Sequence, residues 1–300
     1  MFKLNEICVN YFALLKPRVM SLVVFTASIG MLLPPSHLNM WQILIAILCI
    51  GLGAGAAGAL NMWYDADIDE IMKRTKRRPI PMGKVKASFA LYFGLVLAII
   101  STIILGLVTN WFAALFLAFT IFFYIIIYTI LLKRHTPQNI VIGGAAGAFP
   151  PMVGYACATG DISWQSFSLF LLIFLWTPPH FWALSLFTIT DYDAVSIPML
   201  PNIKGVLTTK KHILVYSVLL CVSAFIPGFF FNGCFLYLIA AFILNFILLD
   251  LAYKLWQCKG EEKSSQIAKK LFYFSLIYLA ALFSAILLEI IFKAILGYSI

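Results

Sequence analysis

The stretch from Trp111 to Leu132, "WFAALFLAFTIFFYIIIYTILL", contains no charged residue. An apolar run of about 20 residues is long enough to cross the hydrocarbon core of a bilayer as a helix. The rest of the chain has the same character, since 63% of its 300 residues are hydrophobic and only 11% are charged. In soluble domains about a quarter of the residues are charged. The sequence therefore predicts an integral membrane protein and excludes a soluble globular domain.

Nine apolar runs of this kind follow one another along the chain. Backbone groups in a bilayer core must be hydrogen-bonded internally, so only helices and closed barrels span it. The runs are too long and too uniformly apolar for barrel strands, which alternate. We therefore expect an all-α protein of nine transmembrane helices around a central apolar cavity, formed as one polytopic domain over residues 1–300. The expected spans are residues 17–33, 41–64, 88–108, 111–132, 140–159, 165–187, 212–231, 234–255 and 270–292.

The basic residues fix an expected orientation, because loops rich in Lys and Arg stay on the cytoplasmic side. With nine spans, every Lys and Arg except Lys293 lies in the N-terminal segment or in an even-numbered loop. This places the N-terminus in the cytoplasm and the C-terminus in the periplasm. The net charge of +9 then reflects this bias and attraction to anionic lipid in the bilayer, and does not indicate nucleic-acid binding. The N-terminal segment resembles neither a cleaved signal peptide nor a transit peptide, which favours a bacterial inner membrane.

Three polar residues recur every fourth position at the cytoplasmic end of the second expected span: Asn61, Asp65 and Asp69. Residues four apart lie on one face of a helix. Their carboxylate and amide oxygens are hard ligands that suit Mg²⁺, which binds a few carboxylates together with substrate phosphate. On a continuous helix Asp67 points elsewhere and is a weaker candidate ligand.

Cations follow these acids directly, at Lys73, Arg74, Arg77 and Arg78. Arg binds phosphate with a bidentate fork and Lys binds it as a point charge. Basic loops beside membrane spans are ordinary topology signals, but acids at membrane depth are costly and are usually functional. Together the acids and cations predict a site for a diphosphate held through Mg²⁺.

The sixth expected span contains the motif "WTPPHFW". We expect Pro178 and Pro179 to break or kink its helix, and a break at membrane depth is tolerated where it lines a cavity. His180 follows between Trp176 and Trp182. It is either a hydrogen-bonded core residue or a functional group.

The remaining polar side chains lie in the loops on the same side of the membrane. Lys133 and Arg134 follow the fourth expected span, and Asp191 and Asp193 follow the sixth. The Phe-rich bundle beyond them could hold a long apolar tail. The pattern as a whole predicts an isoprenoid diphosphate as substrate.

Several motifs resemble those of the intramembrane UbiA-type prenyltransferases, which are nine-helix bundles. They are "LLKPRVMSLVVFTASIGM", "NMWYDADIDEIMKRTKRRPIPMG", "LKRHTPQNIVIGGAAGAFPPMVGY", "WTPPHFWAL" and, after the sixth span, "DY" and "IPMLP". The motifs span residues 14–203, and within the family "WTPPHFW" and "IPMLP" are similar to the branch that farnesylates heme. This sequence departs from many members of the family by having Val195 four residues after Asp191.

The resemblance implies transfer of the farnesyl group of farnesyl diphosphate to a vinyl group of heme b, with addition of water, which gives heme o and diphosphate. It implies Mg²⁺ as cofactor, heme b as a substrate rather than a resident group, and heme A synthase or terminal oxidase assembly as candidate partners. The implied catalytic residues are Asn61, Asp65, Asp69, His180 and Asp191, of which all but His180 are implied metal ligands. The implied substrate-binding residues are Lys16, Arg18, Lys73, Arg74, Arg78, Lys133, Arg134, Trp176 and Tyr192.

Three other functions compete with this interpretation. A prenyltransferase of the same fold that acts on an aromatic quinone precursor would share the metal site and differ in its acceptor pocket. A transporter or channel would carry polar residues through the depth of the bundle, whereas here they gather at one end. A structural membrane subunit would not need Asn61, Asp65 and Asp69 on one helix face.

Overall fold

The computed structural model describes residues 2–230 and 235–296, and within them every regular element is a helix, as predicted. The ends that we expect for two spans at residues 231 and 234 lie outside these ranges. The elements are α1 (Phe2–Leu14), α2 (Pro17–Leu32), α3 (Met40–Tyr64), α4 (Ala66–Ile71), α5 (Ala87–Val108), α6 (Trp111–Phe122), η1 (Phe123–Leu132), α7 (Asn139–Ala148), α8 (Pro150–Thr159), α9 (Trp164–Phe187), α10 (Ile189–Asp193), α11 (Leu200–Lys204), α12 (Val206–Ser223), α13 (Ile226–Phe230), α14 (Phe235–Gln257) and α15 (Glu261–Leu296).

Eight helices of the described chain are long and apolar enough to cross a membrane, and a ninth is reached when a bent pair is counted as one span. The bent pair joins Glu6–Leu14 to Pro17–Leu32 at an angle of 55°. The bend lies at Lys16, whose left-handed backbone (φ 51°, ψ 62°) precedes a proline at the first position of α2. Because a residue before proline is disfavoured in the α region, the chain cannot continue α1 into α2.

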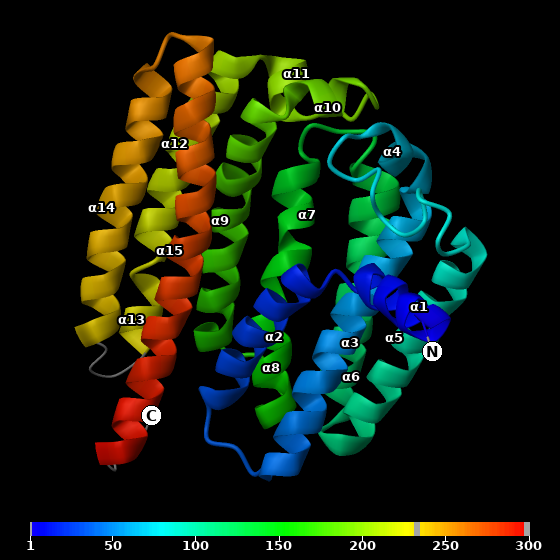
Figure 1. Cartoon of the computed structure of the whole chain (residues 1–300). Helices are drawn as coiled ribbons and strands as arrows, with labels where there is room; N and C mark the ends of the chain where they lie inside the picture. The colour runs from blue at the N-terminus through cyan, green and yellow to red at the C-terminus, as the bar shows by residue number, and fades with distance from the viewer. Residues whose placement is uncertain (1, 231–234, 297–300) are drawn as a thin grey trace.

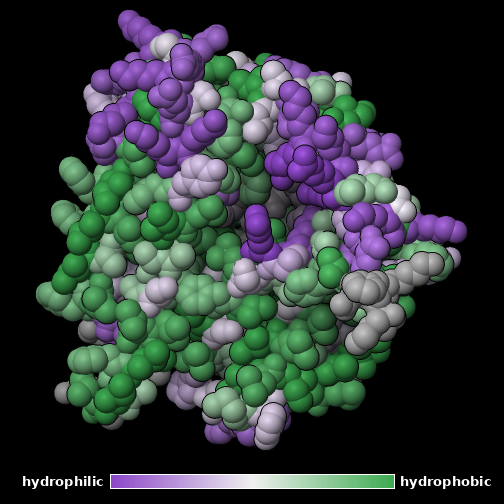
Figure 2. Space-filling model, in the orientation of Figure 1, coloured by the Kyte–Doolittle hydropathy of each residue, from purple (hydrophilic) through white to green (hydrophobic). Residues whose placement is uncertain are grey.

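The helices form two packed groups beside each other (Figure 1). One hydrophobic core contains Trp182, Tyr237, Tyr278 and Phe283, from α9, α14 and α15. A second core contains residues of α2, α3, α6 and α8. Polar residues gather at the end that carries α4, α10 and α11, and the flanks are largely hydrophobic (Figure 2). This distribution is the one expected of a protein whose flanks face lipid.

α2 and α8 approach each other through glycines. A Cβ on Gly30 would lie 2.0 Å from the carbonyl oxygen of Pro151, and a Cβ on Gly154 would lie 1.9 Å from that of Ala27. Small residues allow such close contact between membrane helices. The pair is closely packed in the half of the bundle away from α4, α10 and α11 (Figure 1).

Of the break or kink expected at Pro178 and Pro179, the break is absent. Both prolines lie inside α9, which runs without interruption from Trp164 to Phe187. The two residues are buried, and α7, α12 and α15 pack around this helix. In addition, the Thr177 hydroxyl donates a hydrogen bond of 2.9 Å to the carbonyl oxygen of Ile173. Neighbouring helices and hydroxyl groups of this kind allow prolines within membrane helices.

Candidate active site

Asn61, Asp65 and Asp69 lie one turn apart where α3 passes into α4. The helix is interrupted at Asp65, but the spacing persists, because the Asp65 N–H bonds the Asn61 carbonyl and the Asp69 N–H bonds the Asp65 carbonyl, both at 2.9 Å. The three side chains are 4%, 0% and 2% exposed, respectively. The three oxygen-bearing side chains therefore form one buried row.

The Asn61 amide is held by three side chains from three parts of the chain. Its nitrogen donates to Asp65 Oδ2 at 2.7 Å and to Thr129 Oγ1 at 3.1 Å. Its oxygen accepts from Lys16 Nζ at 2.5 Å. Because an amide offers donors on one atom and an acceptor on the other, this arrangement fixes its orientation. The left-handed backbone at Lys16, a costly conformation for a residue other than glycine, places the amine at this position.

Asp65 is surrounded by cations but has one oxygen without a hydrogen bond. Its Oδ2 pairs with Lys133 Nζ. Its Oδ1 lies 3.6 Å from an Arg134 nitrogen and is buried without a hydrogen-bond partner in the described chain. A buried carboxylate oxygen without a donor is costly, so Oδ1 is suited to receive a ligand that is itself positive.

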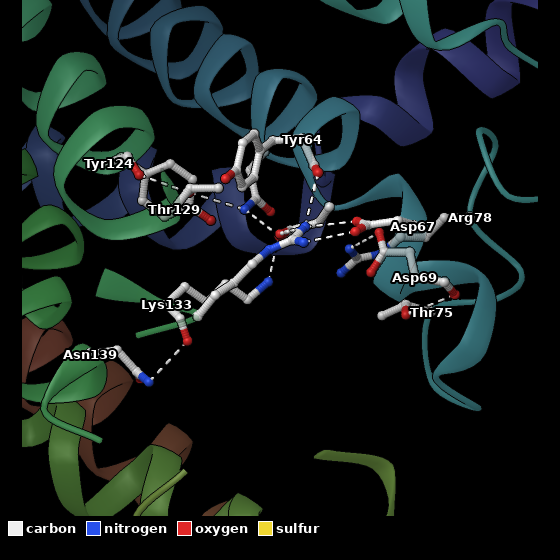
Figure 3. A network of polar contacts seen from close by, with 12 residues as sticks. Tyr64, Asp67, Asp69, Thr75, Arg78, Tyr124, Thr129, Lys133 and Asn139 are labelled. Carbon is white, nitrogen blue, oxygen red and sulfur yellow. Dashed lines mark hydrogen bonds and ion pairs between the residues drawn. The ribbon is translucent and has the colours of Figure 1, made fainter. Parts of the chain in front are cut away.

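Asp67 has a different role from its neighbours. It is exposed and accepts a bidentate hydrogen bond from Arg134, with both distances 2.7 Å. These hydrogen bonds hold the pKa of Asp67 below its ordinary value. Arg134 also donates to the Tyr64 carbonyl at 3.1 Å and lies over the Tyr64 ring at 4.9 Å. The pair thus anchors the chain after η1 to the end of α3 (Figure 3).

The basic segment after α4 folds back onto the acids. Arg78 donates to Asp69 Oδ2 at 2.6 Å, and the Thr75 hydroxyl donates to the Asp69 carbonyl at 3.2 Å. We define the acid–base cluster as the acids Asp65, Asp67 and Asp69, the amide Asn61, and the cations Lys16, Arg78, Lys133 and Arg134. Four cations against three carboxylates leave this cluster able to accept an anion.

A π-helix brings Thr129 and Lys133 to the cluster. In η1 backbone hydrogen bonds run to the fifth preceding residue, as the Lys133 N–H does to the Tyr128 carbonyl at 2.8 Å. The side-chain hydroxyl of Thr129 also donates to the carbonyl five residues earlier, that of Tyr124, at 2.8 Å. The sequence analysis missed Thr129, although a polar residue four positions before Lys133 in an apolar span was a usable signal. Burial lowers the pKa of Lys133, and Asp65 opposes this effect.

An apolar cavity of about 110 Å³ adjoins the acid–base cluster. Lys16 and Tyr124 line it together with residues of α2, α3, α6, α7 and α8, including Gly58 and Gly147. A larger cavity of about 1060 Å³ lies between the ends of α9, α12, α14 and α15 and is lined by none of the cluster residues. Proximity to the acids and cations, rather than size, makes the smaller cavity the candidate for an apolar tail.

Asp191 does not join Asp65 and Asp69 in a ligand group. No three His, Cys, Asp or Glu side chains in the described ranges are placed to hold a metal ion together. The buried residue of α10 is Tyr192, which packs in a hydrophobic core with Ile68 and Met72. Burial raises the pKa of Tyr192, while the nearby Arg74 opposes this. Two further residues expected to bind substrate, Arg18 and Lys73, are exposed.

His180 lies on α9, and its stacking and hydrogen-bond contacts are with α9 and α15 rather than with the acid–base cluster. Its ring stacks on Trp176 and on Phe272, and its Nδ1 is 2.6 Å from Ser275 Oγ. Trp182, the other expected neighbour, packs edge-on against His212 and Tyr216. Phe272 and Ser275 were not predicted from the sequence, because their segment has no local signal beyond apolarity.

A model of the UbiA prenyltransferase family matches residues 23–286, most of the chain. The chain belongs to the UbiA prenyltransferase family. The resemblance drawn from the sequence motifs is thereby confirmed.

Relatives and solved structures of the family agree with this placement. The chain is 57% identical over 280 residues to the protoheme IX farnesyltransferase of Bartonella tribocorum, covering 93% of this chain and 90% of the relative. A protoheme IX farnesyltransferase of Brucella ovis is 54% identical with the same coverage. The fold is similar to that of a digeranylgeranylglyceryl phosphate synthase, with a TM-score of 0.77, 19% identity and coverage of 97% and 99%. It is also similar to a UbiA homologue from Archaeoglobus fulgidus bound to GPP and Mg²⁺, with a TM-score of 0.63, 13% identity and coverage of 92% and 99%.

Proposed function

We propose that this chain transfers the farnesyl group of farnesyl diphosphate to a vinyl group of heme b. Farnesyl carbon and vinyl carbon form the new bond, water supplies a hydroxyl group, and diphosphate and a proton are released, so the product is heme o. The observation that carries the proposal is the buried acid–base cluster beside an apolar cavity at one end of the bundle. The names of the relatives favour heme over a quinone precursor as acceptor.

The acid–base cluster is suited to hold the diphosphate through a metal ion. Asp65 and Asp69 would hold Mg²⁺, and the fit rests on the unpartnered Asp65 Oδ1 and on the hard oxygens of both carboxylates. When bound, Mg²⁺ neutralises charge on the departing diphosphate. Removal of Mg²⁺ with a chelator should abolish turnover, and added Mg²⁺ should restore it.

Lys16, Arg78 and Lys133 would contact the diphosphate oxygens. Each now pairs with Asn61, Asp69 or Asp65, so each is held in place before substrate arrives. Cations fixed where negative charge develops lower the barrier without reorganising during the reaction. Neutral substitutions should therefore raise the KM for farnesyl diphosphate more than that for heme.

The apolar cavity would hold the farnesyl tail with its reacting end near Lys16 and Tyr124. Departure of diphosphate leaves an allylic cation, which needs a site shielded from water. The aromatic face of Tyr124 can stabilise such a cation. The heme vinyl group then attacks as the nucleophile.

Product analysis tests the acceptor directly. Membranes containing the chain are incubated with farnesyl diphosphate, Mg²⁺ and either heme b or 4-hydroxybenzoate, and the products are identified by mass spectrometry. We expect heme that has gained a farnesyl and a hydroxyl group, and no prenylated benzoate. Prenylated benzoate without modified heme would establish the alternative acceptor.

The same proposal includes the setting of the enzyme. The described helices make it a multi-pass membrane protein. The bacterial relatives favour the inner membrane, and the distribution of basic residues favours a cytoplasmic position for the acid–base cluster. The partners that this activity would serve are enzymes that consume heme o, such as heme A synthase, or a terminal oxidase during its assembly.

A further inference from the structure

The larger cavity, of about 1060 Å³, lies at the end of the bundle that carries α10 and α11 (Figure 1). The proposed reaction does not use it. Its apolar lining residues are Leu186, Phe187, Ile189, Val206, Leu207 and Trp256. Leu207 and Trp256 are also exposed, so the cavity opens to the surface of the bundle. It is therefore suited to a ligand that has an apolar portion and comes from the surroundings of the helices.

Lys210 is the buried cation of this cavity. Only 5% of the residue is exposed, and its ammonium donates to the Cys258 carbonyl oxygen at 2.8 Å and to Ser264 Oγ at 2.6 Å. The Ser264 hydroxyl donates in turn to the Gly260 carbonyl oxygen at 2.6 Å, so it accepts from Lys210. Because an ammonium has three donors, one is left for the cavity that Lys210 lines.

No acid neutralises the Lys210 charge. Within residues 2–230 and 235–296 Lys210 forms no ion pair, and both of its hydrogen-bond acceptors are neutral. Lys259, Glu261 and Glu262 also line the cavity, but all three are exposed. The two acids stand in the first turn of α15, where they stabilise the positive end of the helix. A buried charge without a counter-ion is costly, so Lys210 is suited to bind an anion.

We propose that this cavity binds an anionic phospholipid of the surrounding bilayer, with its phosphate at Lys210 and an acyl chain along Leu207 and Trp256. Such a lipid supplies both the anion and the apolar portion, whereas a soluble anion supplies only the first. Basic pockets between membrane helices on the cytoplasmic side bind the head groups of anionic lipids. Trp is enriched at the depth of those head groups.

The lipid site is separate from the prenyl diphosphate site. None of the residues of the acid–base cluster lines the larger cavity, so the lipid and the diphosphate do not compete for a side chain. The proposal goes beyond the proposed function and does not depend on it.

The test is native mass spectrometry of the purified full-length protein in detergent, titrated with phosphatidylglycerol or with phosphatidylcholine of the same acyl chains. Wild type should bind phosphatidylglycerol more tightly. Lys210→Gln should weaken binding of phosphatidylglycerol about tenfold or more, the scale for losing a hydrogen bond to a charged group. Binding of phosphatidylcholine should weaken less, because its choline group partly neutralises the phosphate.

Lys211→Gln is the matched control. Lys211 is the next residue of α12 and carries the same charge, but it is exposed and does not line the cavity. This variant should bind phosphatidylglycerol like wild type. Ser265→Trp keeps Lys210 and fills the cavity from α15, so it should weaken binding of both lipids. Circular dichroism and thermal unfolding in detergent report whether each variant is folded.

Four results would overturn the proposal. The first is wild-type affinity for phosphatidylglycerol in Lys210→Gln, and the second is an equal loss in Lys210→Gln and Lys211→Gln, which would reduce the effect to net charge. The third is competition by glycerol phosphate as effective as that by phosphatidylglycerol, which would make the cavity a site for a free anion. The fourth is displacement of bound phosphatidylglycerol by equimolar heme b, which would assign the cavity to the acceptor.

Ser265→Trp decides the question if Lys210→Gln does not fold. Unchanged affinity of a folded Ser265→Trp protein for phosphatidylglycerol would then place the lipid elsewhere and overturn the proposal. Loss of affinity in this variant, with wild-type affinity in Lys211→Gln, would support it. Formation of heme o is not among the readouts, so failure of the proposed function leaves the result of this test unchanged.

Discussion

Asp65 is the residue on which the acid–base cluster depends most, because it is fully buried and contacts Asn61, Lys133 and Arg134. Asp65→Asn keeps the size of the side chain and removes its charge. We expect kcat to fall about 10²–10³-fold, the scale for losing one electrostatic group at a reacting centre. The measurement is the steady-state rate of heme o formation by purified protein.

Asp67→Asn is the control for this change, since Asp67 is the exposed member of the acid–base cluster and is assigned neither to Mg²⁺ nor to the diphosphate. Its pair with Arg134 is largely solvated, and such pairs contribute about 0–1 kcal/mol. Turnover should stay near that of wild type. Equal losses of kcat in Asp65→Asn and Asp67→Asn would contradict a specific role for Asp65, because turnover would then depend only on the total negative charge of the cluster.

Thr129 holds Asn61 from a different helix. Thr129→Val preserves shape and removes the hydroxyl, leaving the Asn61 amide with one donor unpaired. We expect a loss of stability of about 1–3 kcal/mol and a higher KM for farnesyl diphosphate, measured by thermal unfolding and initial rates. Thr129→Ser should behave like wild type. A Thr129→Val enzyme with unchanged stability and KM would contradict a role in orienting Asn61.

At this scale the sequence predicted the row of Asn61, Asp65 and Asp69, because helical spacing alone brings them together. It did not predict the partners of these residues. Lys133 and Thr129 reach the cluster through the pitch of a π-helix, and Arg134, in the turn after η1, reaches Asp67 of α4. Such pairings depend on tertiary contacts that local spacing does not encode.

Among the elements, α7 controls the width of the tail cavity through Gly147. Gly147 lines the cavity, and a Cβ there would meet no atom within 4 Å. Gly147→Leu should fill this space without disturbing the fold, and should lower kcat/KM for farnesyl diphosphate about tenfold or more, the cost of a few misplaced methylenes. The shorter geranyl diphosphate should be less affected, as measured by competing the two substrates.

Gly143→Ala, one turn earlier on α7, provides the contrast. Its Cβ would lie 2.1 Å from Tyr128 Cδ2, so overpacking should cost about 1–3 kcal/mol of stability. Its preference between the two diphosphates should not change. If Gly147→Leu lowers stability and leaves substrate preference unchanged, then the cavity does not hold the tail.

The positions of the membrane-spanning elements were predictable from apolar runs, but their internal geometry was not. The sequence predicted a break or a kink at Pro178 and Pro179, whereas α9, packed among its neighbours, continues through both prolines without a break. The sequence analysis did not anticipate the π-helix in residues 123–132 or the bend at Lys16, although Pro17 was a usable signal for the bend. The continuity of α9, by contrast, depends on contacts between helices rather than on the composition of one helix.

For the whole molecule, the distribution of basic residues predicts that the cluster end faces the cytoplasm. Two variants test this orientation, each with a single cysteine in a chain whose other cysteines are replaced. One keeps Cys258, between α14 and α15, and the other carries Asp161→Cys, between α8 and α9. A membrane-impermeant maleimide should label position 161 in right-side-out vesicles and position 258 only in inverted ones. The opposite labelling pattern would reverse the orientation.

The central claim is that the acid–base cluster and the adjoining apolar cavity form the prenyl diphosphate site. An experimental structure with Mg²⁺ and a non-hydrolysable farnesyl diphosphate analogue tests it most directly. We predict the diphosphate among Asp65, Asp69 and Lys133, with the tail passing Tyr124 toward Gly147. A diphosphate bound instead in the larger cavity between α9, α12, α14 and α15 would contradict the claim.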